Sequence, residues 1–100
     1  MYSNQKVQGE YNMKYNVVSP SGKLTEVLYV YESYTGWYWF ITEVQPEGYA
    51  YGFVHGLEDE WGEIYMPDIE KLIEAGQVWK VPRKNWLGIS YLCAQREEFN

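Results

Sequence analysis

The sequence has little of what disulfide formation, zinc binding and membrane insertion require. Its 100 residues include one cysteine and one histidine, and no uninterrupted apolar run exceeds five residues. The single Cys93 excludes an intramolecular disulfide and a four-thiolate zinc site, and it favours a reducing compartment. A membrane-spanning helix needs about 20 apolar residues, and the first six residues lack the apolar core of a signal peptide. These features predict a soluble, cytoplasmic protein.

Basic residues are also scarce. Eight Lys and Arg stand against fourteen Asp and Glu, so the formal net charge is -6 and the pI is about 4.7. Nucleic acids and anionic membranes are both bound through basic surfaces, so direct binding of either is disfavoured. Aromatic residues, in contrast, reach 19%, and hydrophobic residues 46%. This composition predicts one globular domain over residues 13–100, preceded by a polar, flexible N-terminal arm at residues 1–12.

Short segments rich in aromatic and β-branched residues alternate with turn signals, which predicts an antiparallel sheet. The segment 37–44 carries Trp39 and Ile41 on one side and Tyr38 and Phe40 on the other. A strand with two apolar faces is covered on both, so we expect it to be central, with a helix or a partner protein on the second face. The strands expected are 15–18, 26–32, 37–44, 49–54, 61–65 and 78–81.

The segment 67–75 has the features of a short helix. Pro67 suits its first turn, Gly76 suits its end, and Ile69, Leu72 and Ile73 form one apolar stripe that should pack on the sheet. Residues 85–99 fit a weak helix, although part of this segment also fits a strand. The fold class expected is therefore α+β: a small antiparallel sheet of about four to five strands, one short packed helix and a possible C-terminal helix.

The charges are unevenly distributed along the chain. Eleven of the fourteen acidic residues lie between Glu26 and Glu74, where Lys71 is the only base. The densest acidic stretch is expected on a loop. It is either a solvated face that keeps the protein soluble or a surface that docks on a basic partner, with exposed aromatic residues as anchors. The candidate protein-binding residues are Glu58, Asp59, Glu60, Glu63, Tyr34 and Trp37.

Catalytic motifs are missing. His55 has no paired serine or cysteine motif and is interpreted as an ordinary turn residue, and Cys93 lies far from it along the chain. The sequence contains no glycine-rich phosphate loop and no calcium-loop pattern. We therefore expect no cofactor, no metal site and no enzyme activity. A hydrolase that pairs Glu43 or Glu47 with His55 is the alternative that remains.

Residues 39–47, W-F-I-T-E-V-Q-P-E, are similar to the W-L-L-T-E-L-D-P-E run of a mobile-element family called domain of unknown function 2958. Further counterparts follow at 51–53, 55–56, 60–64 and 67–72, so the resemblance covers roughly residues 37–74. Its most specific part is Thr42-Glu43 with the turn at Pro46-Glu47. The resemblance implies a genetic context of plasmids, conjugative elements and phages, and no established activity.

Together these features predict a non-enzymatic, acidic protein-binding module from a mobile genetic element or phage. Its expected partner is a basic protein, such as a nucleic-acid-binding defence protein that it inhibits or regulates, as antirestriction and anti-CRISPR proteins do. The alternative is a small-ligand or carbohydrate-binding module that uses Trp37, Trp39 and neighbouring tyrosines.

Overall fold

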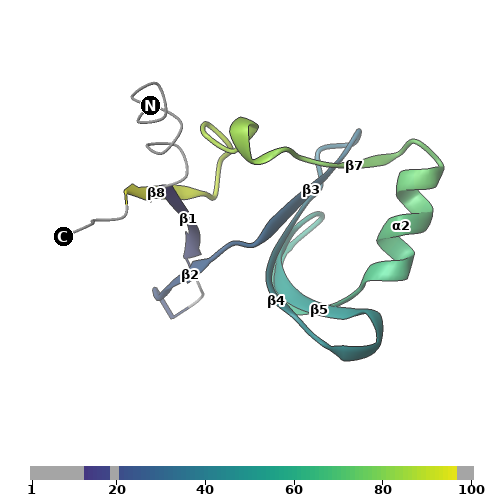
Figure 1. Ribbon diagram of the computed structural model, residues 1–100, viewed down its shortest axis with the longest axis horizontal. Helices are drawn as coiled ribbons and strands as arrows, with labels where there is room; N and C mark the ends of the chain where they lie inside the picture. Colours follow the sequence, from purple (N-terminus) through teal and green to yellow (C-terminus); the bar gives the residue numbers. More distant parts are fainter. Residues whose placement is uncertain (1–12, 19–20, 97–100) are drawn as a thin grey trace, which may run out of the picture.

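The computed structural model describes residues 13–18 and 21–96, which form two antiparallel sheets and one α-helix. A three-stranded sheet has the order β2-β1-β8, and a five-stranded sheet has the order β6-β5-β4-β3-β7. The helix α2 and the three-stranded sheet lie on opposite sides of the five-stranded sheet (Figure 1). The elements are β1 (Met13–Val18), β2 (Leu24–Glu26), β3 (Tyr29–Ser33), β4 (Tyr38–Val44), the 3-10 turn η1 (Pro46–Gly48), β5 (Tyr49–His55), β6 (Asp59–Tyr65), α2 (Met66–Glu74), β7 (Val78–Lys80), the 3-10 turn η2 (Arg83–Asn85) and β8 (Cys93–Arg96).

The prediction that the segment with Trp39 and Ile41 is the central strand is confirmed, because β4 is the third of five strands. Phe40 is fully buried in a cluster with residues of the three-stranded sheet, such as Val17. Ile41, one residue along, is buried in a second cluster with Ile69 of α2. Successive side chains of a strand point to opposite faces, so both apolar faces of β4 have a covering layer.

The predicted helix is confirmed, but its apolar stripe is narrower than expected. Ile69 is 4% exposed and packs with Ile64 of β6 and Val78 of β7, and Leu72 is half-buried against this cluster. Ile73, predicted to press on the sheet, is instead exposed. Adjacent helical positions differ by about 100° around the axis, and the sheet contacts the side that Ile69 shares with Leu72. Ile73 therefore lies beyond the margin of the contact.

The three-stranded sheet is the main feature that the sequence analysis missed. The strand expected at 26–32 is in fact divided between the two sheets, and the chain crosses at Val27 and Leu28. The N–H of Val27 donates to the carbonyl of Tyr15 at 2.8 Å, and the N–H of Leu28 donates to the carbonyl of Ile41 at 2.7 Å. Backbone hydrogen bonds are made at both residues of the crossing, so the chain passes from one sheet to the other without a turn. No turn residue therefore marks the crossing in the sequence.

The predicted C-terminal helix at 85–99 is wrong. Gly88 and Tyr91 both have a positive φ, which interrupts a helix, and β8 pairs with β1. Trp86 fixes this segment: it is 3% exposed, its Nε1–H donates to the carbonyl of Val81 at 3.0 Å, and its ring packs edge-on against Tyr15. The proposed N-terminal arm, residues 1–12, lies outside the described residues.

Candidate functional site

Two turns of the five-stranded sheet lie together at one of its ends. Ser33 pairs with Val78, Tyr38 pairs with His55, and His55 pairs with Asp59, so the β3–β4 turn and the β5–β6 turn are neighbours. We call this region, residues 33–38, 55–59 and 77–78, the hairpin end. It contains four of the six predicted binding residues and the first residues of three strands, β4, β6 and β7.

The β3–β4 turn holds Trp37 in a fixed position. The buried Ser33 hydroxyl accepts hydrogen bonds from the N–H groups of Thr35 at 3.2 Å and Trp37 at 3.0 Å. The Trp37 indole then lies against the backbone of Gly56, where a Cβ atom would come within 2.5 Å of the ring. Only glycine fits at this position without displacing the indole, so Trp37 joins the two turns.

An apolar groove of about 290 Å³ opens at the hairpin end on the helix side. Tyr34, which is 70% exposed, stands at this groove, and the Trp37 and Trp39 rings inside it are 5.8 Å apart. The structure thus brings together the two predicted aromatic anchors, Tyr34 and Trp37. The groove is lined by Ser33, Tyr34, Thr35, Trp37, Trp39, Leu72, Gln77 and Val78.

The predicted acidic loop is only partly a loop. Glu58 lies in the β5–β6 turn, but Asp59 and Glu60 already belong to β6, because Asp59 pairs with His55. Glu63 lies further along the same strand. All four acidic side chains are exposed, so the acidic stretch lies mainly on an edge strand of the sheet.

The strand geometry separates these carboxylates. Glu60 pairs with Val54, which pairs with Trp39, so Glu60 faces the helix side in the same row as the groove. Two strand spacings, about 10 Å, separate Glu60 from Trp39. Asp59 and Glu63 point to the other face. The six predicted residues therefore do not form one flat patch: they follow the hairpin end and then the β6 edge.

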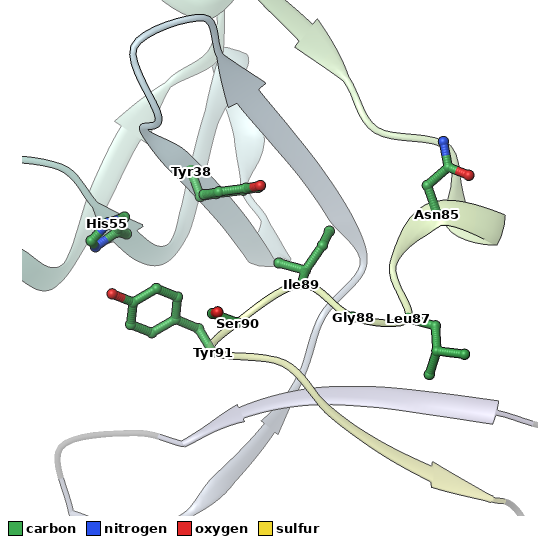
Figure 2. Close-up of a pocket in the computed structure, with 8 residues that line it drawn as sticks. All are labelled: Tyr38, His55, Asn85, Leu87, Gly88, Ile89, Ser90 and Tyr91. Atoms are coloured by element: carbon green, nitrogen blue, oxygen red, sulfur yellow. The ribbon is translucent and has the colours of Figure 1, made fainter.

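A second cavity, of about 480 Å³, lies on the face toward the three-stranded sheet (Figure 2). His55 lines it, with Nδ1 2.5 Å from Oδ1 of Asp59 and with its ring centroid 4.7 Å from that of Tyr91. The interpretation of His55 as a turn residue is wrong, because it is the last residue of β5. The cavity is lined by Tyr38, His55, Asn85, Leu87, Gly88, Ile89, Ser90 and Tyr91.

Tyr38 contributes a neutral hydroxyl to the region of this cavity. Its O–H donates to Glu32 at 2.9 Å, and Nε1–H of Trp79 donates to the other carboxylate oxygen at 3.2 Å. Burial, the hydrogen bond to Glu32 and the charge of Glu32 raise the pKa of Tyr38 above its usual value of about 10. The phenol therefore keeps its proton, and its one O–H is engaged by Glu32.

Other predicted combinations are not assembled. Glu43 pairs with Tyr51, four residues before His55 on β5, a separation of about 13 Å along the strand. Cys93 is exposed on β8 and does not line the His55 cavity. In the described ranges 13–18 and 21–96, no three His, Cys, Asp or Glu side chains gather closely enough to hold a metal ion. The one α-helix of this part of the chain is too short to cross a membrane.

The comparisons with known proteins give no relative: no family model, no curated protein and no solved structure matches the chain significantly. The site therefore rests on geometry. One of its features had a sequence signal that was missed. Residues 59–65, D-E-W-G-E-I-Y, do not alternate between polar and apolar residues, so a strand that begins at Asp59 has no clear period-2 signal. The sequence signal for this pairing lies in the turn instead. The spacing of His55 and Asp59 across a three-residue turn is that of cross-strand neighbours.

Proposed function

We propose that this protein is a non-enzymatic, acidic protein-binding module that docks on a basic partner through the hairpin end and the β6 edge. One observation carries the proposal. β6 is the terminal strand of its sheet, seven residues long, and no strand of the described chain pairs with its outer edge. This edge has exposed carboxylates on both faces and begins beside the aromatic groove.

The two parts of this surface contribute differently to binding. The exposed carboxylates of Glu58, Glu60 and Glu63 would attract a basic surface over long distances and raise the association rate. The groove beside Tyr34 and Trp37 would bury apolar side chains and slow dissociation. A partner would then be selected by its charge and retained by its apolar contacts.

A basic nucleic-acid-binding protein fits this surface best. Such proteins carry the Lys and Arg residues that normally contact phosphates, and an acidic strand competes for the same residues. The partner would thus be inhibited or regulated in its binding of nucleic acid. The cytoplasmic location and the mobile-element context belong to the same proposal, the latter through the resemblance of residues 37–74 to domain of unknown function 2958.

The test is a kinetic comparison of two charge-reversed variants. After the partner has been captured from the native cell and purified, association is measured for Glu60→Lys/Glu63→Lys and for the control Glu70→Lys/Glu74→Lys, which makes the same change in net charge on α2. We expect the β6 variant to associate roughly tenfold more slowly at low salt and the control much less so. Equal effects of both variants, or an affinity independent of salt, would show that the β6 carboxylates only solubilise the protein.

A second candidate function is the binding of a small neutral ligand in the His55 cavity. The cavity is lined by the rings of His55 and Tyr91 and by the polar side chains of Asn85 and Ser90, and its lining includes no Lys, Arg, Asp or Glu. Aromatic faces with neutral hydrogen-bonding groups suit an uncharged, hydroxyl-rich ring such as a sugar. Ligand-observed NMR with a panel of neutral saccharides tests this: binding that is lost in Tyr91→Ala supports it, and no binding at millimolar concentrations excludes it.

A further inference from the structure

The backbone of β6 has a regular set of outward-facing groups. In an antiparallel ladder, hydrogen-bonded and non-hydrogen-bonded residue pairs alternate. The N–H of Gly56 donates to the carbonyl of Glu58 at 3.2 Å, which makes these two residues a hydrogen-bonded pair at the start of the β5–β6 ladder. From this point along β5 and β6, non-hydrogen-bonded and hydrogen-bonded pairs follow one another in turn.

This alternation, which we call the ladder phase, determines whether the N–H and C=O groups of each β6 residue point toward β5 or away from it. Glu60 and Gly62 pair with Val54 and Gly52 through the ladder, so their N–H and C=O groups point inward. The N–H and C=O groups of Asp59, Trp61 and Glu63 then point away from β5, toward the outer edge. The N–H of Gln45, which donates to Tyr49 across the β4–β5 ladder, gives the same phase independently.

The side chains on the outer edge define what could pair with it. Asp59, Trp61 and Glu63 also share one face, where the carboxylates of Asp59 and Glu63 flank the half-buried Trp61. On the opposite face, a Cβ atom at Gly62 would meet no atom within 4 Å, so the sheet surface at this position is uncovered. Cross-strand neighbours of opposite charge stabilise pairing, and apolar side chains favour an aromatic neighbour.

A second copy of this chain is a poor occupant. Pairing two β6 strands would place several carboxylates beside one another, and like charges across a ladder are destabilising. Charged residues on edge strands are a common way in which proteins prevent such self-pairing. The same charges favour a strand that carries Lys or Arg.

We propose that the basic partner binds by β-strand addition: an extended segment of the partner pairs antiparallel with the outer edge of β6. Its basic residues lie opposite Asp59 and Glu63, and an apolar residue lies opposite Trp61. The inference rests on the proposed function, because it specifies how the acidic edge is recognised. Main-chain hydrogen bonds supply affinity in this mode, and alternate side chains supply specificity.

The test uses the wild-type protein and three synthetic peptides of equal charge. The parent peptide is acetyl-Thr-Thr-Lys-Thr-Val-Lys-Lys-amide, in which the third, fifth and seventh residues face Glu63, Trp61 and Asp59 in the proposed register. One derivative is N-methylated at its third and fifth residues, whose N–H groups would point at β6. The matched control is N-methylated at its fourth and sixth residues, whose N–H groups would point to solvent. Binding is followed by NMR titration of the ¹⁵N-labelled protein.

We expect the parent and the control peptide to bind with similar affinity and to shift the amide signals of Asp59, Trp61 and Glu63. The derivative methylated on the inward amides should bind at least tenfold more weakly. Equal binding of the two methylated peptides would overturn strand addition and leave charge-based docking standing. No binding by the parent at millimolar concentration would also overturn strand addition, as would a dimer of the free protein that occupies the β6 edge. The proposed function itself is decided separately, by the charge-reversed variants and the captured partner.

Discussion

The two edges of the five-stranded sheet are protected from uncontrolled pairing in different ways. β7 has three residues, its last residue is Lys80, and Pro82, which has no N–H, follows shortly after. β6 has seven residues, and all its exposed side chains are acidic except that of Tyr65 at its end. A short strand ended by proline offers few groups to any partner. A long acidic strand disfavours pairing with a second copy of itself, because like charges repel, but its backbone groups stay accessible to a basic segment.

The difference between the edges also appears in the charges around them. Near β7, Lys80 lies over the Tyr29 ring at 4.4 Å, and Arg83 lies over the Tyr15 and Trp86 rings at 5.3 and 5.0 Å. These cations are engaged with aromatic rings of the same chain. The carboxylates of Glu60 and Glu63, in contrast, are exposed. The cations near β7 thus act within the fold, whereas the β6 carboxylates are the ones that our proposal assigns to binding.

The largest expected effect is a difference in stability between a glycine substitution inside the sheet and one at the β6 edge. Gly52 and Gly62 pair with each other across β5 and β6. A Cβ atom at Gly52 would lie 2.0 Å from the carbonyl oxygen of Phe40, whereas one at Gly62 would meet nothing within 4 Å. We expect Gly52→Ala to lower the free energy of unfolding by about 3 kcal/mol or more and Gly62→Ala to change it by less than about 1 kcal/mol.

Urea unfolding of both variants measures this comparison. The two substitutions reduce the entropy of the unfolded chain equally, so their difference reports the folded state. A Gly62→Ala variant as unstable as Gly52→Ala would show that another part of the chain covers the β6 edge on its helix side.

A smaller effect is expected in α2, which connects the two edges. Ile69 packs with Ile64 of β6 and Val78 of β7. Ile69→Ala should lower the free energy of unfolding by about 2–5 kcal/mol, and the exposed Ile73→Ala by less than about 1 kcal/mol. Thermal unfolding checks both, and similar losses for the two variants would contradict the orientation of α2.

The fold could be predicted from the sequence where local patterns decide it. The two-sided apolar segment with Trp39 and Ile41 indicated a central strand, and Pro67 and Gly76 marked the ends of the helix. The three-stranded sheet could not be predicted in this way. Its pairing of Met13 with Arg96 joins opposite ends of the described chain, and nothing in either short segment specifies the other.

The candidate site was predicted in composition but not in geometry. The acidic stretch and the aromatic anchors Tyr34 and Trp37 were identified as residue types. Their arrangement depends on the contact of Trp37 with Gly56 and on the phase of the β6 ladder, which are properties of the folded chain. The His55 cavity was missed because Tyr91 and Ser90 approach His55 only after the C-terminal segment has folded back on the sheet.

The smallest predicted effect concerns Tyr38, the first residue of the central strand β4, at alkaline pH. The pKa of Tyr38 is raised by burial and then by its hydrogen bond to Glu32 and the charge of Glu32, so the folded state holds this proton more tightly than the unfolded state. Its contribution to stability is complete below pH 10 and is lost as the pH rises through the raised pKa. The free energy of unfolding should therefore fall less steeply above pH 10 in Tyr38→Phe than in the wild type. Parallel pH profiles of the two proteins would refute this contribution.

The most direct test of the central claim, that the outer edge of β6 is open, is amide hydrogen exchange. It is measured by NMR along β6 in the free protein. The ladder phase predicts an alternation in which the amides of Trp61 and Glu63 exchange rapidly and those of Glu60, Gly62 and Ile64 are protected by β5. Uniform protection of all five amides would contradict the account, because it would mean that another strand already occupies the outer edge of β6.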